Sequence, residues 1–282
     1  MTKKSERNDP GKGAYRQMVR TLDGRPVEFH VDVSVEEVPA VRRLRRRARA
    51  LEAALAALAA DVNLSRGTRA QAARGLSHVS HPTEKTLDAL VALRDDPQMG
   101  VQATYGVGSN VYRLRKDDPA LAGRGLNELL NTLTTSQEER IRERALVALG
   151  NAGHPDSLPH LERSLGDPSP NVRAAAANAI RRVEGDDGDR LLARALGDTS
   201  PAVRRGAVEA MLERAPSQVL EAALGILITT EPEQSVRARA VQVVGTWWLE
   251  KPGVLRDSLQ SVASYDASED LRLMARNILA HP

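Results

Sequence analysis

Apolar residues recur along this 282-residue chain at the three- and four-residue spacing of amphipathic helices, and the helical pattern itself repeats. Residues 165–183 and 196–214 align without gaps at an offset of 31. With Arg173 as the anchor, the same phase returns at intervals of 33, 40, 31, 31, 33 and 35 residues. The anchor positions are Arg69, Gln102, Arg142, Arg173, Arg204, Arg237 and Arg272. Units of this length predict about seven stacked helix pairs.

A turn and a second helix are recognisable around each anchor. Short polar residues, most of them acidic and suited to turns and helix caps, stand six positions earlier, and prolines cluster in the same stretch. These polar residues are Asn63, Asp96, Ser136, Asp167, Asp198, Glu231 and Asp266. A small residue, usually alanine, follows three positions after the anchor and allows helices to approach closely. This order is that of HEAT repeats, so the sequence predicts an all-α, HEAT-like α-α superhelix over residues 39–282.

The recurring arginine has two interpretations. It could form a row of anion-binding groups along the molecule. Alternatively, each arginine hydrogen-bonds the acidic turn of its own or the adjacent repeat. Because acid and base recur together at a fixed spacing, we favour the structural interpretation.

The N-terminal segment does not follow the repeat. Apolar residues from Val27 to Val35 alternate with polar ones, which is the period of a β-strand, and Asp23-Gly24 precedes them as a turn signal. We therefore expect a small β-hairpin over residues 14–38 and a disordered tail over residues 1–13. An isolated hairpin is marginally stable, so its apolar face is expected to dock on the first helix pair, a partner chain or further strands.

Residues 41–62 predict a long helix with apolar residues spaced by three and four, including Leu51, Leu55, Leu58 and Val62. Six arginines lie within residues 42–49. One interpretation is a partner-binding or coiled-coil helix, or a contact with nucleic acid or anionic lipid. The candidate contact residues are Arg42, Arg45, Arg46 and Arg49. The other is a first helix whose apolar seam packs on the solenoid while its basic face is solvated, and we favour this one.

Repeat two departs from the pattern, since Gln102 replaces the anchor arginine and Tyr105 replaces the alanine. Gly106 and Gly108 stand inside its second helix, where each glycine costs about 1 kcal/mol relative to alanine. Close packing against a neighbouring helix is the favoured explanation. The alternative is a surface shaped for a ligand, with Tyr105 and Tyr112 on one helix face.

Composition limits the class of protein. Only 2% of residues are aromatic, which disfavours a thick-cored globule and a β-sandwich. The net charge of +3 divides into +7 on residues 1–75 and −4 on the remainder, so we expect no nucleic-acid partner for the repeats. Cysteine is absent, and we expect no membrane span and no signal peptide.

Common catalytic and cofactor-binding motifs are absent from the sequence. The sequence has no P-loop, no G-x-S-x-G elbow and no complete dinucleotide-binding glycine pattern. His78 and His81, and His154 and His160, lack carboxylates at ligand spacing, so we expect no metal and no other cofactor. Enzymes built from such repeats use His-Glu dipeptides for iron, which this chain lacks, or aromatic residues over a basic surface. We interpret Trp247-Trp248 as packing between repeats six and seven.

Two segments stand out from the general repeat pattern: ALGNAGHP at residues 148–155, followed by Asp156, Ser157 and Leu158, and the preceding YGVGSNVYRL. On these segments, residues 86–250 resemble the helical domain of large lipid transfer proteins, a family that includes vitellogenin. It implies a helical module that docks against lipid-binding β-sheets in a larger assembly. In that case the chain would function outside the cytoplasm and lipid would be a partner.

The function favoured by the residues themselves is a non-catalytic scaffold or adaptor in the cytoplasm. It would bind a protein or peptide partner on the concave face formed by the second helices. The candidate contact residues on this face are Arg142, Arg205 and Arg239, together with Tyr105 and Tyr112. A helical module of a lipid-transfer protein is the alternative.

Overall fold

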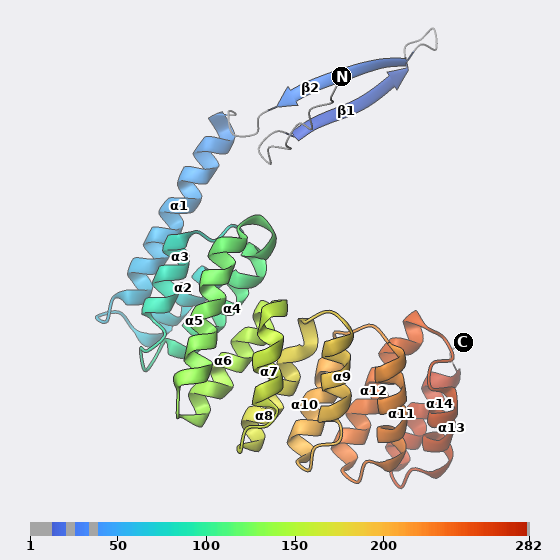
Figure 1. The fold of residues 1–282 in the computed structure, drawn as a ribbon. Coiled ribbons are helices and arrows are strands. Elements are labelled where there is room, and N and C mark those ends of the chain that lie inside the picture. The colour runs from blue at the N-terminus through green and yellow to red at the C-terminus, as the bar shows by residue number, and fades with distance from the viewer. Residues whose placement is uncertain (1–12, 21–25, 34–38, 281–282) are drawn as a thin grey trace, which may run out of the picture. The chain divides into compact units, whose positions relative to one another are not determined.

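The computed structural model describes residues 13–20, 26–33 and 39–280, and describes side chains from Arg46 to Ala280. The chain divides into two compact units, residues 1–54 and 55–282, and the boundary falls inside the first long helix. Residues 1–12 of the expected tail and the Asp23-Gly24 turn lie outside the described residues. Figure 1 shows the order of the elements along the chain.

The first unit contains two antiparallel strands, β1 (Gly13–Arg20) and β2 (Pro26–Val33). Their register places Tyr15 opposite Val31 and Gln17 opposite Phe29. The strand β2 lies within the run of alternating apolar and polar residues. Such alternation is typical of a strand, since successive side chains of a strand point to opposite faces.

The helices of the described residues form seven pairs, in agreement with the predicted all-α solenoid. The first helices of the pairs are α1 (Pro39–Ala60), α3 (Glu84–Ala92), α5 (Pro119–Thr135), α7 (Leu158–Ser164), α9 (Asp186–Ala195), α11 (Gln218–Thr230) and α13 (Arg256–Tyr265). The second helices are α2 (Arg66–Ser77), α4 (Gly100–Asp117), α6 (Glu139–Ala152), α8 (Pro170–Ala179), α10 (Pro201–Met211), α12 (Gln234–Glu250) and α14 (Glu269–Ala280). Two short 3₁₀ turns, η2 (Pro155–Ser157) and η3 (Ile180–Arg182), lie before α7 and after α8. Each anchor falls near the start of a second helix.

Sequence signals at the turns explain where the helices begin. Pro119, Pro170 and Pro201 occupy the first helical turn, where a missing amide donor costs nothing. The side chains of Asp118 and Ser169 accept hydrogen bonds from backbone amides of that turn. Helix starts are therefore fixed locally by the same polar turns that define the repeat.

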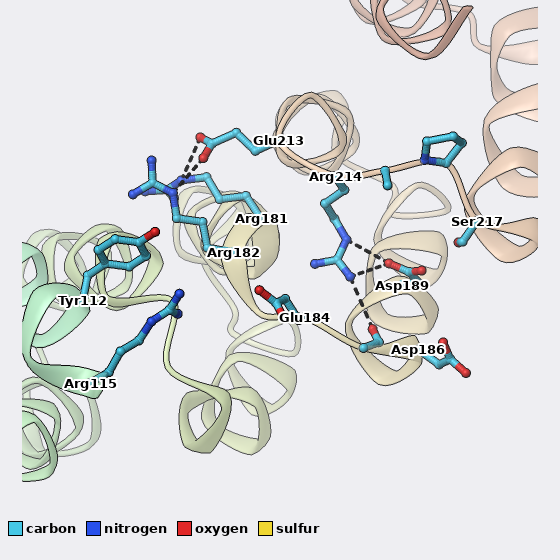
Figure 2. Close-up of a pocket in the computed structure, with 13 residues that line it drawn as sticks. Tyr112, Arg115, Arg181, Arg182, Glu184, Asp186, Asp189, Glu213, Arg214 and Ser217 are labelled. Carbon is cyan, nitrogen blue, oxygen red and sulfur yellow. Dashed lines mark hydrogen bonds and ion pairs between the residues drawn. The ribbon is translucent and has the colours of Figure 1, made fainter. Parts of the chain in front are cut away.

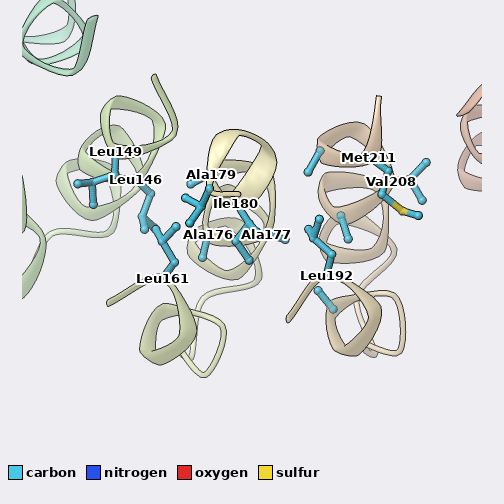
Figure 3. Packing of buried hydrophobic residues seen from close by; sticks show 14 of the residues in the cluster. Leu146, Leu149, Leu161, Ala176, Ala177, Ala179, Ile180, Leu192, Val208 and Met211 are labelled. Carbon is cyan, nitrogen blue, oxygen red and sulfur yellow. The ribbon is translucent and has the colours of Figure 1, made fainter. Parts of the chain in front are cut away.

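The second helices pack against one another in a row from α2 to α14. The alanine column that follows the anchors is buried at this interface, as Ala176 and Ala207 illustrate, and Figure 3 shows how little side chain separates the helices. The core between the two helix layers is filled by leucine, isoleucine and methionine residues such as Leu161, Ile180 and Met211. Small residues at the contacts replace the aromatic core that the composition lacks.

The helix α1 corrects one expectation. Glu52 and Ala59 are its buried residues and Leu55 is half-buried, whereas Leu51 and Leu58 are 59% and 43% exposed. The buried stripe is thus displaced by one position from the predicted seam, and three of the four seam residues named above, Leu51, Leu58 and Val62, face solvent. Arg46 and Arg49 are exposed on this helix, and the side chains of Arg42 and Arg45 lie outside the described residues.

The tryptophans contact different neighbours, which corrects the interpretation that both pack between repeats six and seven. The indole Nε1 of Trp247 donates a hydrogen bond to the carbonyl of Arg214 at 2.8 Å, so Trp247 joins repeat six to repeat five. Trp248 faces the other way along the chain, with the guanidinium of Arg256 5.2 Å from its ring centre. Both side chains are buried.

Candidate functional site

The anchor arginines form a ladder of inter-repeat ion pairs. The guanidinium of Arg173 makes two parallel hydrogen bonds to the carboxylate of Asp198, at 2.9 and 3.0 Å. Its third nitrogen donates to the carbonyl of Asp167 in its own turn at 3.0 Å. Two-pronged arginine–carboxylate pairs recur at Arg142–Asp167, Arg204–Glu231 and Arg237–Asp266, and a single-pronged pair joins Arg69 to Asp96. The structural interpretation of the arginine column is confirmed, and the carboxylate belongs to the following repeat.

This arrangement corrects the placement of Arg142 among exposed contact residues. Its side chain is only 18% exposed, and all three guanidinium nitrogens donate hydrogen bonds, two to Asp167 and one to the carbonyl of Gln137. The residue is an element of the scaffold.

The pairing holds the ladder carboxylates in their charged form. The hydrogen bond from Arg173 lowers the pKa of Asp198, and that from Arg69 lowers the pKa of Asp96. Burial raises the pKa of Glu231 and Asp266, but the hydrogen bonds from their arginine partners and from backbone amides outweigh it, so the net shift is also downward.

The ladder is interrupted once, at repeat two. Gln102 occupies the arginine position, and Ser136 occupies the position of the carboxylate in the next repeat. Both members of one pair are therefore replaced together, as expected if they form a single inter-repeat contact. The buried amide oxygen of Gln102 has no hydrogen-bond partner.

The glycines of repeat two are explained by close packing, as favoured from the sequence. A Cβ atom on Gly108 would lie 2.1 Å from the carbonyl oxygen of Ala148 in α6. A Cβ atom on Gly106 would lie 2.3 Å from the hydroxyl of Ser77 in α2. The backbone of α4 thus approaches both neighbouring second helices more closely than any other residue type permits.

A second set of contacts joins the second helices at their C-terminal ends. Arg113 donates to the carbonyl of Ser77, and Arg115 donates to the carbonyl of Gly153 at 2.9 Å. Arg181 donates to the side chain of Asn151 at 2.7 Å, and Arg214 donates to the carbonyl of Val183 at 2.6 Å. Together with Trp247, these residues bridge every interface from α2 to α12. The carbonyls they satisfy are those that a helix end leaves unpaired.

One part of this edge also forms an open cavity of about 460 Å³, shown in Figure 2. Tyr112 from α4 lies between two arginines, with the guanidinium carbon of Arg115 4.3 Å and that of Arg182 5.6 Å from its ring centre. Arg181 and Arg182 both approach the carboxylate of Glu213, at 3.2 and 2.7 Å. We name these five residues the Tyr112 cluster.

The Tyr112 cluster contains three arginines but only one carboxylate, that of Glu213. Arg181 and Arg182 share one carboxylate, and burial lowers the pKa of the Arg181 guanidinium. Among the described residues, Arg115 forms no ion pair, and its Nη1 is bound only to the carbonyl of Gly153. The ring of Tyr112 is 42% exposed. A second open cavity of about 480 Å³ shares Arg115 and Arg182 and adds Lys116.

The remaining candidate residues are distributed elsewhere. Tyr105 is half-buried beside a separate cavity that Arg140 and Arg144 also line, and burial raises the pKa of its hydroxyl. The structure therefore places Tyr105 and Tyr112 in different cavities. Arg205 is exposed on α10, and Arg239 on α12 donates to Gln242 at 2.8 Å.

Sequence reasoning missed Arg115, Arg181 and Arg182, although the repeat carried a signal. Asn151, Arg182 and Glu213 all stand nine positions after their anchors, and Tyr112, Arg214 and Trp247 stand ten positions after theirs. Large polar or aromatic residues recurring at the end of each second helix indicate contacts across repeats.

The described residues contain no group of three or more metal-ligating side chains, and none of their helices combines the length and apolar character needed to cross a membrane. The first cavity is lined by ion pairs such as Arg214–Asp189 and by Arg115, which forms no ion pair among the described residues. The arrangement can bind anionic and aromatic groups through arginine, and it holds no nucleophile–base pair.

Comparison with known proteins agrees with this architecture. A family model for HEAT repeats matches residues 126–213. This match and the seven helix pairs show a HEAT/armadillo-like α-solenoid fold. A search of curated proteins finds no significant match.

Similar solved structures include a hydroxylase, a lyase complex and a HEAT-like repeats protein. Human deoxyhypusine hydroxylase in complex with glycerol is 15% identical, with 86% of this chain and all of that chain covered and a TM-score of 0.41. A chain of the CpcE–CpcF complex of phycocyanin lyase from Nostoc is 17% identical, with coverages of 81% and 93% and a TM-score of 0.48. The archaeal HEAT-like repeats protein of Thermococcus onnurineus is 14% identical, with coverages of 81% and 95% and a TM-score of 0.48. At these identities the likeness concerns the fold alone.

Nothing in these comparisons supports the resemblance to large lipid transfer proteins. The segments that carried it have local structural roles in this chain. Gly108 provides the close approach of α4 to α6, and Gly153 ends α6 in the left-handed conformation with a φ of 52°. Glycines at these positions follow from helix packing and capping.

Proposed function

We propose that this protein is a non-catalytic scaffold that binds a protein or peptide partner through the Tyr112 cluster. The observation that carries the proposal is the exposed ring of Tyr112 held between two arginines at an open cavity. Tyrosine and arginine contribute most strongly to protein interfaces, because they bury large areas and retain a polar end.

The charges of the cluster indicate the chemistry of the partner. Among the residues that the structure describes, Arg115 pairs with no carboxylate, and Arg181 and Arg182 share that of Glu213. A carboxylate on a partner would gain hydrogen bonds from these guanidinium groups, and an aromatic or apolar side chain beside it would cover the ring of Tyr112. We therefore propose an acidic peptide segment that also carries an apolar or aromatic residue. Arg205 and Arg239, on α10 and α12, would extend the contact along the layer of second helices.

Selection from a random peptide display library on the full chain tests this proposal. Enriched peptides should be acidic, and their affinity should fall at least about tenfold for Tyr112→Ala and for Arg182→Glu. Arg163→Glu is the matched control, because Arg163 is exposed on α7 and its side chain forms no ion pair among the described residues. Enrichment of no peptide, or equal binding by all variants, would contradict the proposal.

A further inference from the structure

The arginine ladder has an open C-terminal end. Arg272 of α14 makes the same contact with its own turn as the other ladder arginines, donating to the carbonyl of Asp266 at 2.6 Å. The equivalent bonds of Arg204 and Arg237 are 2.9 and 2.8 Å long. The side chain of Arg272 is therefore oriented like theirs, yet no carboxylate among the described residues pairs with it.

Within the described part of the chain, the unpaired group at the N-terminal end of the ladder is an acid. In the ladder, Asp198 and Asp266 each accept a hydrogen bond from the backbone amide two residues later, at 2.8 Å. Asp61 accepts the same bond from the amide of Asn63 at 2.9 Å, and it directly follows α1 as Asp266 follows α13. Asp61, and not Asn63 as the alignment indicated, is thus the ladder acid of repeat one. No arginine among the described residues pairs with it.

Both ends also expose apolar side chains beside these charges. Leu58 and Val62 flank Asp61 and are 43% and 75% exposed. Leu273 and Met274 follow Arg272 and are 55% and 38% exposed. Inside the solenoid, the residues at the place of Leu58 are buried, as Ala195 before Asp198 and Ile228 before Glu231 illustrate.

We infer that two copies of this chain dock end to end, with Arg272 of one copy bound to Asp61 of the next. The second copy is the occupant because the chain itself carries both halves of the ladder contact. Arg272 binds its own turn as the internal arginines do, and Asp61 accepts the amide of Asn63 as the internal acids accept theirs. The exposed apolar residues of the two ends would then cover each other. Such a contact is heterologous, so a stack of any length keeps one free end of each kind and can grow further.

The expected behaviour is association that continues beyond two copies as concentration rises. Sedimentation equilibrium of the full chain from about 1 μM to about 500 μM should show an average mass that climbs past twice that of one chain. Arg272→Glu should remain at the mass of one chain over this range. Asp61→Asn should do so too, since asparagine keeps the acceptor for the amide of Asn63 and removes only the charge.

A mixture of these two variants distinguishes the end-to-end contact from any other. The Arg272→Glu chain keeps Asp61 and the Asp61→Asn chain keeps Arg272, so a one-to-one mixture should form a pair and stop there. The control Arg163→Glu should associate like the unmodified chain. A chain that stays single at every concentration overturns the inference, as does a symmetric dimer that either variant still forms. Folding of each variant is checked by its circular dichroism.

Discussion

At the scale of single residues, a ladder arginine such as Arg173 binds two turns at once, its own and that of the next repeat. Arg173 fixes its own turn by binding a carbonyl and holds the next repeat by binding a carboxylate. The carboxylate in turn accepts a backbone amide of its own turn, as Asp198 does from Ser200. Each pair therefore couples the conformation of two turns, and side chains only 15% and 16% exposed are well screened from water.

Asp198→Asn tests the charge of one such pair. The substitution keeps an acceptor for Ser200 and removes the negative charge that faces Arg173. We expect the free energy of unfolding at pH 7 to fall by about 1–3 kcal/mol, the usual contribution of hydrogen bonds to charged groups. Urea unfolding followed by circular dichroism measures this change.

The ladder carboxylates also predict how the stability of the protein changes with pH. The folded pKa of Asp198 lies below the value of about 3.9 found in unfolded chains, so its contribution is complete above that value and is lost as pH falls through the folded pKa. The unmodified protein should lose stability steadily below about pH 5, helped by Asp96, Glu231 and Asp266, and Asp198→Asn should lose less over the same interval. An identical acid slope in both proteins would argue against the pair.

At the scale of elements, α4 is the helix whose sequence departs most from the repeat and whose packing is closest. Its glycines lie against backbone or short side chains of α6 and α2, which have little freedom to move. The same helix lacks the anchor arginine, so backbone proximity and the bond from Arg115 to Gly153 hold it to α6 in place of an ion pair.

Gly108→Ala should destabilise the protein by about 1–3 kcal/mol, because the new methyl group would overlap the Ala148 carbonyl and force the helices apart. Gly123→Ala is the matched control in the neighbouring helix α5, where nothing lies within 4 Å of the added methyl. It should stabilise the protein by up to about 1 kcal/mol through helix propensity. Thermal unfolding of the two variants separates the effects, and a stabilising Gly108→Ala would refute the packing explanation.

Sequence periodicity predicted the helix pairs because turns and caps are encoded locally, within a few residues of each anchor. It also predicted the pairing of arginine with the acidic turn, since both columns recur together. The Tyr112 cluster could not be derived in the same way. Arg115 and Arg182 stand 13 and nine positions after their anchors, and they meet at one ring only because of the three-dimensional stacking.

The buried face of α1 could also not be predicted from the sequence. Its three- and four-residue spacing identified a helix correctly, but two stripes one position apart satisfy the same spacing. The structure buries Ala59 and exposes Leu58. Alanine is buried where backbones approach closely, so hydrophobicity alone selected the wrong stripe.

At the scale of the whole molecule, stability is built from contacts between neighbouring repeats. The helix α8 lies between α6 and α10, whereas α14 packs against α12 and its own partner α13. The bridge at the C-terminal ends of the second helices also stops at α12. Opening the last repeat therefore breaks one interface, while opening a central repeat breaks two.

Hydrogen exchange should reflect this difference. At low concentration, where copies are separate, amides of α14 should exchange at least about tenfold faster than those of α8, which corresponds to roughly 1.4 kcal/mol of opening free energy. Mass spectrometry of exchanged peptides measures both helices in one experiment. Uniform protection along the solenoid would show that it opens as a single unit.

The position of the tryptophans makes the protein's own fluorescence a local probe. Both indoles of the chain lie in α12, one bonded toward repeat five and the other stacked on Arg256 of repeat seven. Their emission therefore reports water entering at these two interfaces and is insensitive to the repeats that precede them. Circular dichroism sums over all helices. Separate midpoints by the two methods would mean that the solenoid unfolds in segments, and a shared midpoint would mean that its repeats unfold together.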